Sequence, residues 1–215
     1  LVALSVDFHI SQWFIAGHCP GFFRECFELV EPFGNGLGVL VIVVAVSMLD
    51  PFRRAAVPRI MAASLGAGLT ADIVKLMIVR TRPCQFTFQG DVWDTFGGFF
   101  PFISAGSGGQ SFPSAHTATA VGLAVVLSRL YPRGRGLFAV LAVLVACQRI
   151  QGGAHYLSDT MVGAAVGCVV GAVCLHRALL GAWFDRYEYH FRALERPVLR
   201  VAPKSGQVEP ERRAA

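Results

Sequence analysis

The residues between positions 75 and 159 include several side chains of the kinds that bind and attack phosphate. They are Lys75, Arg82, His116, Arg149, His155 and Asp159. Fixed cations can receive a tetrahedral dianion, and an arginine adds a planar pair of N–H donors for phosphate oxygens. A carboxylate four residues after a histidine can hold one ring nitrogen and leave the other free to attack. We therefore expect these residues to meet in a site that attacks a phosphate ester with histidine.

The first group contains two cations seven residues apart, Lys75 and Arg82. Seven residues are two helical turns, so this spacing predicts that both side chains project from one helix face. Pro83 follows at once and is expected to end that helix. The neighbouring Arg80 and Asp72 are predicted to anchor the helix at the membrane interface and to balance charge.

The second group, Pro113 to His116, begins an apolar run. Proline suits the first turn of a helix, and a helix start offers free N–H groups and the positive end of the dipole. Such a terminus binds phosphate. Ser114 can add its hydroxyl and Ala115 its backbone N–H, while His116 can pass a proton.

The third group is Arg149, His155 and Asp159. Asp159 is predicted to accept a hydrogen bond from one ring nitrogen of His155, and Arg149 to bind equatorial phosphate oxygens. Gly152 and Gly153 allow the intervening turn to approach closely.

The elements that must position these groups are apolar. The chain of 215 residues is 54% hydrophobic and 15% charged, whereas a soluble domain has about 25% charged residues. Five runs are almost free of charge: 32–49, 60–79, 113–128, 136–148 and 160–175. Spanning a bilayer takes about 20 residues. We predict an all-α, multi-pass transmembrane helical bundle. A soluble bundle is the alternative, but few amphipathic helices remain to cover it.

The two ends of the chain differ from this bundle. Residues 1–6 are apolar, and we expect a further membrane helix upstream of them. Segment 7–30 mixes aromatic and charged residues, as does a helix that lies in the membrane interface or packs on other helices. Residues 1–196 are predicted to form one membrane domain, and the polar residues 197–215 a disordered cytoplasmic tail.

Arginines indicate the orientation, because positively charged loops face the cytoplasm. They gather after the first and third of the full-length runs and after the last run, at residues 53–59, 129–135 and 177–213. The three groups above then lie on the opposite, periplasmic side of the cell (inner) membrane.

Together the three groups resemble the three-part signature of the type 2 phosphatidic acid phosphatase (PAP2) family. The matching segments are Lys75-x6-Arg82-Pro83, Pro113-Ser114-Ala115-His116 and Arg149-x5-His155-x3-Asp159. The resemblance covers about residues 75 to 159. The chain departs from it at Ala115, where the family usually has glycine, and at Gln148, where it usually has serine.

The resemblance implies a six-helix membrane fold with its active site at the outer leaflet. It implies that His155 attacks phosphorus and forms a phosphohistidine, that Asp159 orients it, and that His116 protonates the leaving alkoxide. The phosphate oxygens would be held by Lys75, Arg82, Ser114 and Arg149.

We expect no metal ion and no cofactor. The sequence offers no cluster of carboxylates for magnesium, and fixed cations with a helix terminus can neutralise a phosphate. The six cysteines suggest no disulfide framework, and Cys19 beside His18 lacks the further ligands of a zinc site. The scattered arginines form no nucleic-acid footprint.

The expected partner is a membrane lipid phosphate: phosphatidate, phosphatidylglycerol phosphate, a phosphorylated glycolipid or, slightly preferred, a polyprenyl diphosphate. A phosphotransferase with the same histidine chemistry is the nearest alternative. A vanadate haloperoxidase is soluble, which the apolar runs oppose, and a transporter would need polar residues along a path through the membrane. Aromatic residues between 86 and 102 are expected either to guide lipid tails as a flexible lip or to pack on the helices.

Overall fold

The computed structural model describes residues 2–99 and 109–195, and most of them are helical. The helices are α1 (Val2–Ile15), α2 (Gly21–Val30), α3 (Gly36–Leu49), α4 (Val57–Lys75), α5 (Ala115–Leu130), α6 (Arg135–Gln151), α7 (Leu157–Leu175) and α8 (Ala182–Glu195). Two short strands, β1 (Ile78–Arg80) and β2 (Phe96–Phe99), pair antiparallel. The predicted tail 197–215, and Phe100 and Phe102 of the predicted lip, lie outside the described residues.

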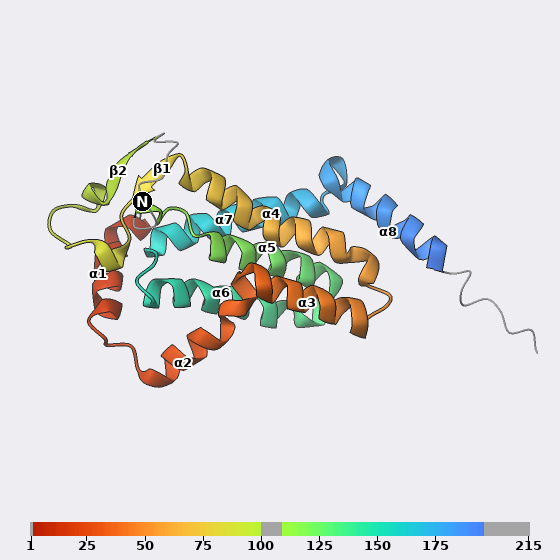
Figure 1. Ribbon diagram of the computed structural model, residues 1–215, viewed down its shortest axis with the longest axis horizontal. Helices are drawn as coiled ribbons and strands as arrows, with labels where there is room; N and C mark the ends of the chain where they lie inside the picture. Colours follow the sequence, from red (N-terminus) through yellow and green to blue (C-terminus); the bar gives the residue numbers. More distant parts are fainter. Residues whose placement is uncertain (1, 100–108, 196–215) are drawn as a thin grey trace, which may run out of the picture.

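Helices α3 to α7 correspond to the five apolar runs, so the predicted all-α membrane bundle is confirmed (Figure 1). In the described part, three helical stretches are long and apolar enough to cross a membrane: Arg54–Lys75, Pro132–Gln151 and Leu157–Leu194. A fourth span results if Gly21–Gly34 and Gly36–Leu49, which are bent by 70°, form one crossing. Helix α5 is apolar but has only 16 residues.

Helix α5 lies at the centre of the bundle, packed against α4, α6 and α7. Small residues allow this approach. A Cβ on Gly122 would stand 2.3 Å from the carbonyl oxygen of Ala63 on α4, and a Cβ on Gly167 of α7 would stand 2.6 Å from that of Ala118. Close backbone contact at small residues is typical of membrane helix pairs. The start of α5 lies between the C-terminal half of α4 and the first turns of α7.

Helix α1 crosses the end of the bundle instead of running along it (Figure 1). Asp7 and Ser11 on this helix are buried, and the ring of Phe8 contacts those of Phe86 and Tyr156. Packing on other elements therefore explains the inward face of α1.

The prediction that Lys75 and Arg82 share a helix face is wrong. Helix α4 ends at Lys75, and the chain then enters β1, whose Ile78 pairs with Phe99 of β2. The β-branched Ile78 and Val79 favour a strand, and Pro83 disfavours helical backbone at Arg82, which is extended. The position of Arg82 relative to Lys75 is therefore set by the tertiary fold of this segment and not by helical spacing.

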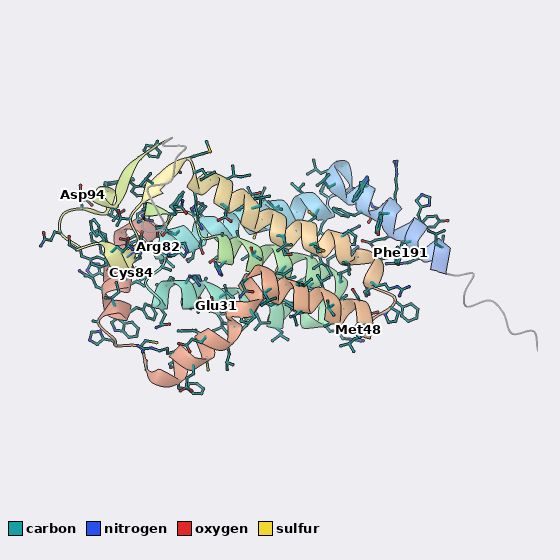
Figure 2. The ribbon with its side chains drawn as sticks, viewed as in Figure 1. Glu31, Met48, Arg82, Cys84, Asp94 and Phe191 are labelled. Atoms are coloured by element: carbon teal, nitrogen blue, oxygen red, sulfur yellow. The ribbon has the colours of Figure 1, made fainter. Side chains whose placement is uncertain are left out.

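The opposite end of the bundle holds the arginine-rich turns and α8. Arg59 at the start of α4 is buried and forms ion pairs with Asp185 (2.6 Å) and Glu188 (2.9 Å) of α8. Figure 2 shows Met48 and Phe191 at this end, and Arg82 and Cys84 at the other. The residues predicted to bind and attack phosphate are therefore separated from the arginine-rich turns by the length of the bundle.

Candidate active site

Four helices and the segment after β1 bring the predicted residues to one end of the bundle. His155, in the turn between α6 and α7, lies within electrostatic range of Asp159, Lys75 and Arg149. His116, in the first turn of α5, lies within range of His155 and of the same two cations. Arg82 in turn acts on Arg149. The three sequence groups thus form one cluster.

The ring of His155 is almost completely buried and has a defined orientation. Its Nδ1 lies 2.6 Å from the carbonyl oxygen of Ser111 and 3.8 Å from Oδ2 of Asp159. Because a carbonyl oxygen only accepts, Nδ1 carries the proton and Nε2 keeps its lone pair. The distances make Ser111 the hydrogen-bond acceptor, with the Asp159 carboxylate beside the same nitrogen. The sequence prediction assigned that bond to Asp159 and missed Ser111.

The turn before His155 is fixed by its backbone. Gly153 has a φ of +63°, a conformation that L residues rarely adopt, and its carbonyl oxygen accepts from the N–H of Cys84 at 3.0 Å. The carbonyl of Arg149 accepts from the N–H of His155 at 3.3 Å. This turn therefore ties the imidazole to the end of α6 and to the segment that carries Arg82.

The environment of His155 favours the neutral imidazole. Burial lowers the pKa of His155 below its ordinary value of 6.5, and Lys75 and Arg149 act in the same direction, while Asp159 opposes them. A neutral ring is the form that can attack an electrophile.

The carboxylate of Asp159 is fully buried and held from several sides. It accepts from the Ser111 hydroxyl at 2.6 Å, from the Tyr156 N–H at 2.8 Å and from the Arg80 guanidinium. Ser111 thus binds both His155 and Asp159 and connects the two. No sequence motif marks Ser111, because its role depends on a contact across 44 residues of chain.

The prediction that Arg80 anchors a helix at the membrane interface is wrong, although Arg80 does balance charge as predicted. Its side chain is completely buried, between the rings of Phe96 (4.6 Å) and Tyr156 (4.1 Å). It donates to Asp159 and to Asp7 of α1 instead of anchoring a helix at the membrane interface. Asp72 also balances charge as predicted, since it pairs with Lys75 at 3.2 Å.

The start of α5 has a capped helix terminus with backbone N–H groups that no helical carbonyl satisfies. Ser114 is the N-cap, and its hydroxyl oxygen accepts from the Thr117 N–H (3.4 Å) and hydroxyl (3.0 Å). Its own proton is then free to point elsewhere. The N–H groups of Ala115 and His116 lie in the first turn, where a helix has no internal acceptor. The methyl of Ala115 packs among small residues of α4, which accommodate this departure from glycine.

Two arginines of this cluster each have a buried N–H group that no acceptor in the described part of the chain satisfies. Within residues 2–99 and 109–195, the buried Nε atoms of Arg82 and Arg149 have no hydrogen-bond partner. Arg149 is held from its other side by Glu31 (3.4 Å) and Gln148 (3.2 Å). Because unpaired buried donors are costly, these groups indicate a site for an anion.

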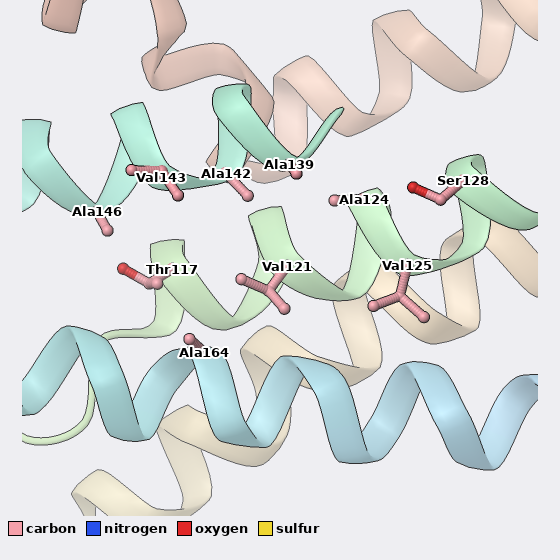
Figure 3. A pocket seen from close by; sticks show the side chains of 10 residues that line it. All are labelled: Thr117, Val121, Ala124, Val125, Ser128, Ala139, Ala142, Val143, Ala146 and Ala164. Carbon is pink, nitrogen blue, oxygen red and sulfur yellow. The ribbon is translucent and has the colours of Figure 1, made fainter. Parts of the chain in front are cut away.

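A hollow of about 300 Å³ opens beside the cluster, between α3, α4 and α5. Its lining includes His116 and Asp72 together with Asn35 and several glycines. A larger groove of about 490 Å³ between α5, α6 and α7 is lined by alanine, valine, serine and threonine (Figure 3). That groove contains no ionisable side chain. The smaller hollow reaches the cluster at His116 but is not lined by His155, Lys75, Arg82 or Arg149, so the candidate site is the cluster itself.

The guanidinium geometry of Arg149 can be tested directly. Arg149→Lys keeps the charge but loses the planar fork, so kcat/KM for a phosphate ester is expected to fall about tenfold to a hundredfold. The measurement is phosphate release by purified protein. The matched control is Arg186→Lys on exposed α8, which should retain wild-type kcat/KM. Equal activity of both variants would contradict the role of the fork.

The chain is similar in sequence to curated phosphatases. The chain is 37% identical over 101 residues to a lipid A 1-phosphatase of Rhizobium johnstonii, covering 47% of this chain and 39% of that protein. It is 43% identical over 63 residues to a decaprenylphosphoryl-5-phosphoribose phosphatase of Mycobacterium tuberculosis, covering 29% and 34%. The chain thus spans less than half the length of these curated relatives.

Two crystal structures share the fold. LpxE of Aquifex aeolicus superposes with a TM-score of 0.58 at 19% identity, covering 79% of this chain and 94% of that one. A transmembrane PAP2-type phosphatidylglycerolphosphate phosphatase of Bacillus subtilis gives 0.57 at 19% identity, covering 80% and 84%. The family model of the PAP2 superfamily matches residues 57–180, which include all three sequence groups. Because this match covers more than half of the chain, the protein belongs to the PAP2 superfamily.

Proposed function

We propose that the protein is an integral-membrane lipid phosphate phosphatase that works through a phosphohistidine intermediate and needs no metal ion. The observation that carries the proposal is the orientation of His155. Its Nδ1 is hydrogen-bonded to Ser111 beside the Asp159 carboxylate, so Nε2 is left free near a cluster of cations. Phosphoryl transfer depends mainly on such positioning and charge neutralisation.

The reaction would proceed in two steps. In the first, Nε2 of His155 bonds to phosphorus, the bond from phosphorus to the leaving oxygen breaks, and His116 gives that oxygen a proton. In the second, His116 takes a proton from water, the water oxygen bonds to phosphorus, and the P–N bond breaks to release inorganic phosphate. Asp159 and Ser111 would stabilise the positive ring that forms in between.

The phosphate oxygens would be bound by two kinds of group. Fixed positive charge would come from Lys75, Arg82 and Arg149, and the unpaired Nε atoms of the two arginines support this assignment. The hydroxyl of Ser114 and the N–H of Ala115 would add donors at the helix terminus.

The substrate would be a lipid with a terminal phosphate, reached from the membrane. Phosphorylated glycolipids are the first to test, because the two curated relatives are named as phosphatases of lipid A and of a decaprenyl-linked phosphoribose. Phosphatidate, phosphatidylglycerol phosphate and polyprenyl diphosphate present a similar group. We further propose that the site faces the periplasmic side of the inner membrane, since the arginine-rich turns lie at the other end.

The test is release of inorganic phosphate from a panel of these lipids by purified protein in a chelator. We expect full activity with chelator on at least one lipid phosphate. Product analysis separates the two candidate acceptors, because a phosphotransferase would yield a phosphorylated alcohol in place of free phosphate. Loss of activity in chelator that returns with a divalent cation would contradict the metal-independent mechanism.

The acid side of the pH profile should reflect the burial of His155. Because burial lowers the pKa of His155, its attacking neutral form should persist to a lower pH than that of an ordinary histidine. The acid limb of kcat/KM is therefore expected below the ordinary value of 6.5. The measurement is kcat/KM with a soluble phosphate ester across the acidic range. A limb centred above 6.5 would contradict attack by a desolvated imidazole.

A further inference from the structure

The buried charges behind His155 extend to helix α1. The Arg80 Nη2 donates to Asp7 Oδ2 at 2.8 Å, and Nη1 donates to Asp159 Oδ1 and to the Ser158 hydroxyl, the latter at 2.7 Å. The side chains of Asp7, Arg80 and Asp159 are fully buried. One guanidinium therefore bridges two carboxylates, one from α1 and one from α7.

Asp7 also holds the start of α7. Its Oδ1 accepts from the Ser158 N–H at 2.9 Å, and its Oδ2 accepts from the Ser158 hydroxyl at 2.5 Å. Ser158 directly precedes Asp159. Asp7 is thus connected indirectly to the Asp159 carboxylate in two ways, through the side chain of Arg80 and through Ser158, the residue that precedes Asp159.

The charges of this network do not cancel. Two carboxylates face one guanidinium, which leaves one net negative charge next to the ring of His155. If Asp159 alone faced Arg80, the cation would offset most of its charge. Because Asp7 shares the cation, Asp159 keeps negative charge for the ring, which becomes positive as it attacks. Electrostatic interactions between charged groups are stronger in a buried site than in water.

We propose that Asp7 and Arg80 are positioning residues for the reaction, acting on His155 through Asp159, so that α1 is part of the catalytic unit. The inference rests on the proposed phosphatase function. Asp7 lies outside residues 57–180, which match the family model, whereas Arg80 and Asp159 lie inside them.

The experiment compares Asp7→Asn with Ser11→Ala. Both residues are buried on α1, one helical turn apart, and the Ser11 hydroxyl has no hydrogen-bond partner in the described part of the chain. For Asp7→Asn we expect kcat to fall about tenfold or more, with KM changed less than about twofold, because the substrate does not touch Asp7. Ser11→Ala should keep wild-type kcat and KM.

The pH profile provides a readout that mere docking of α1 would not move. The groups that face His155 are Asp159 on α7, Lys75 on α4, Arg149 on α6 and His116 on α5. In Asp7→Asn, Arg80 offsets more of the Asp159 charge, so the acid limb of kcat/KM should move to lower pH. In Ser11→Ala it should not move.

A double-mutant cycle separates positioning from loss of folding. If Asp7 acts through Asp159, then Asp7→Asn should reduce kcat less than about twofold in an Asp159→Asn background. Equal losses of kcat in both backgrounds would overturn the inference, and so would a wild-type kcat and pH profile for Asp7→Asn. In either case the proposed function would still stand if the wild-type protein releases phosphate. Wild-type protein that releases phosphate from no lipid of the panel would overturn both.

Discussion

His155→Gln is expected to reduce phosphate release by about a thousandfold or more. Glutamine keeps a polar side chain of similar length but has no nitrogen lone pair able to bond to phosphorus. The residue is almost completely buried, and in the two-step scheme every turnover passes through its Nε2. The assay measures inorganic phosphate from the best lipid substrate in the presence of chelator.

The same variant should also lose the covalent intermediate. Wild-type protein mixed with a phosphorus-labelled substrate and quenched rapidly should retain label that is stable in base and released by acid, as a phosphoramidate is. His155→Gln should retain none. His190→Gln, at an exposed histidine of α8, is the matched control and should label like wild type. A His155→Gln protein with substantial turnover would rule out the proposed nucleophile.

His116→Ala should reduce activity on alkyl phosphates by about a hundredfold to ten-thousandfold, the range of general acid catalysis. Its ring lies at the start of α5, within range of His155 and among the charges of Lys75 and Arg149. In the proposed reaction, a bound phosphate would supply the negative charge that the protonated ring requires in such a place. The proton would then neutralise the leaving alkoxide.

The leaving group distinguishes this role from a structural one. An aryl phosphate with an acidic phenol needs no proton on departure, so its first step should be nearly normal in His116→Ala. If His116 also activates water, the labelled phosphohistidine should accumulate with that substrate. Equal losses for alkyl and aryl phosphates, without accumulation, would instead indicate that His116 only supports the fold.

The aromatic residues near the site show what amino-acid composition can and cannot predict. The sequence left open whether they form a lip or pack on helices. Phe86 and Phe88 pack on Phe8 of α1, and Phe96 covers Arg80. Trp93 and Phe99 remain exposed. An aromatic residue can satisfy either arrangement, and contacts with segments remote in sequence decide between them.

The sequence by itself determined the kind of protein and the main chemical groups. Long apolar runs need helices to satisfy their backbone in a membrane, and the five runs became α3 to α7. The spacing of His155 and Asp159, and the position of His116 at a helix start, depend on local geometry. Local geometry can be read from neighbouring residues.

Only the tertiary structure decided how the charges are held. The acceptor for His155 and the carboxylate partners of Arg80 follow from contacts that cross 44 to 79 residues of chain. The place of Arg82 likewise depends on the contact of the neighbouring Cys84 with Gly153. Such contacts carry no periodic pattern, because each depends on how remote helices pack. An arginine near an apolar run has the same sequence signature whether it faces the membrane interface or, like Arg80, bridges two buried carboxylates.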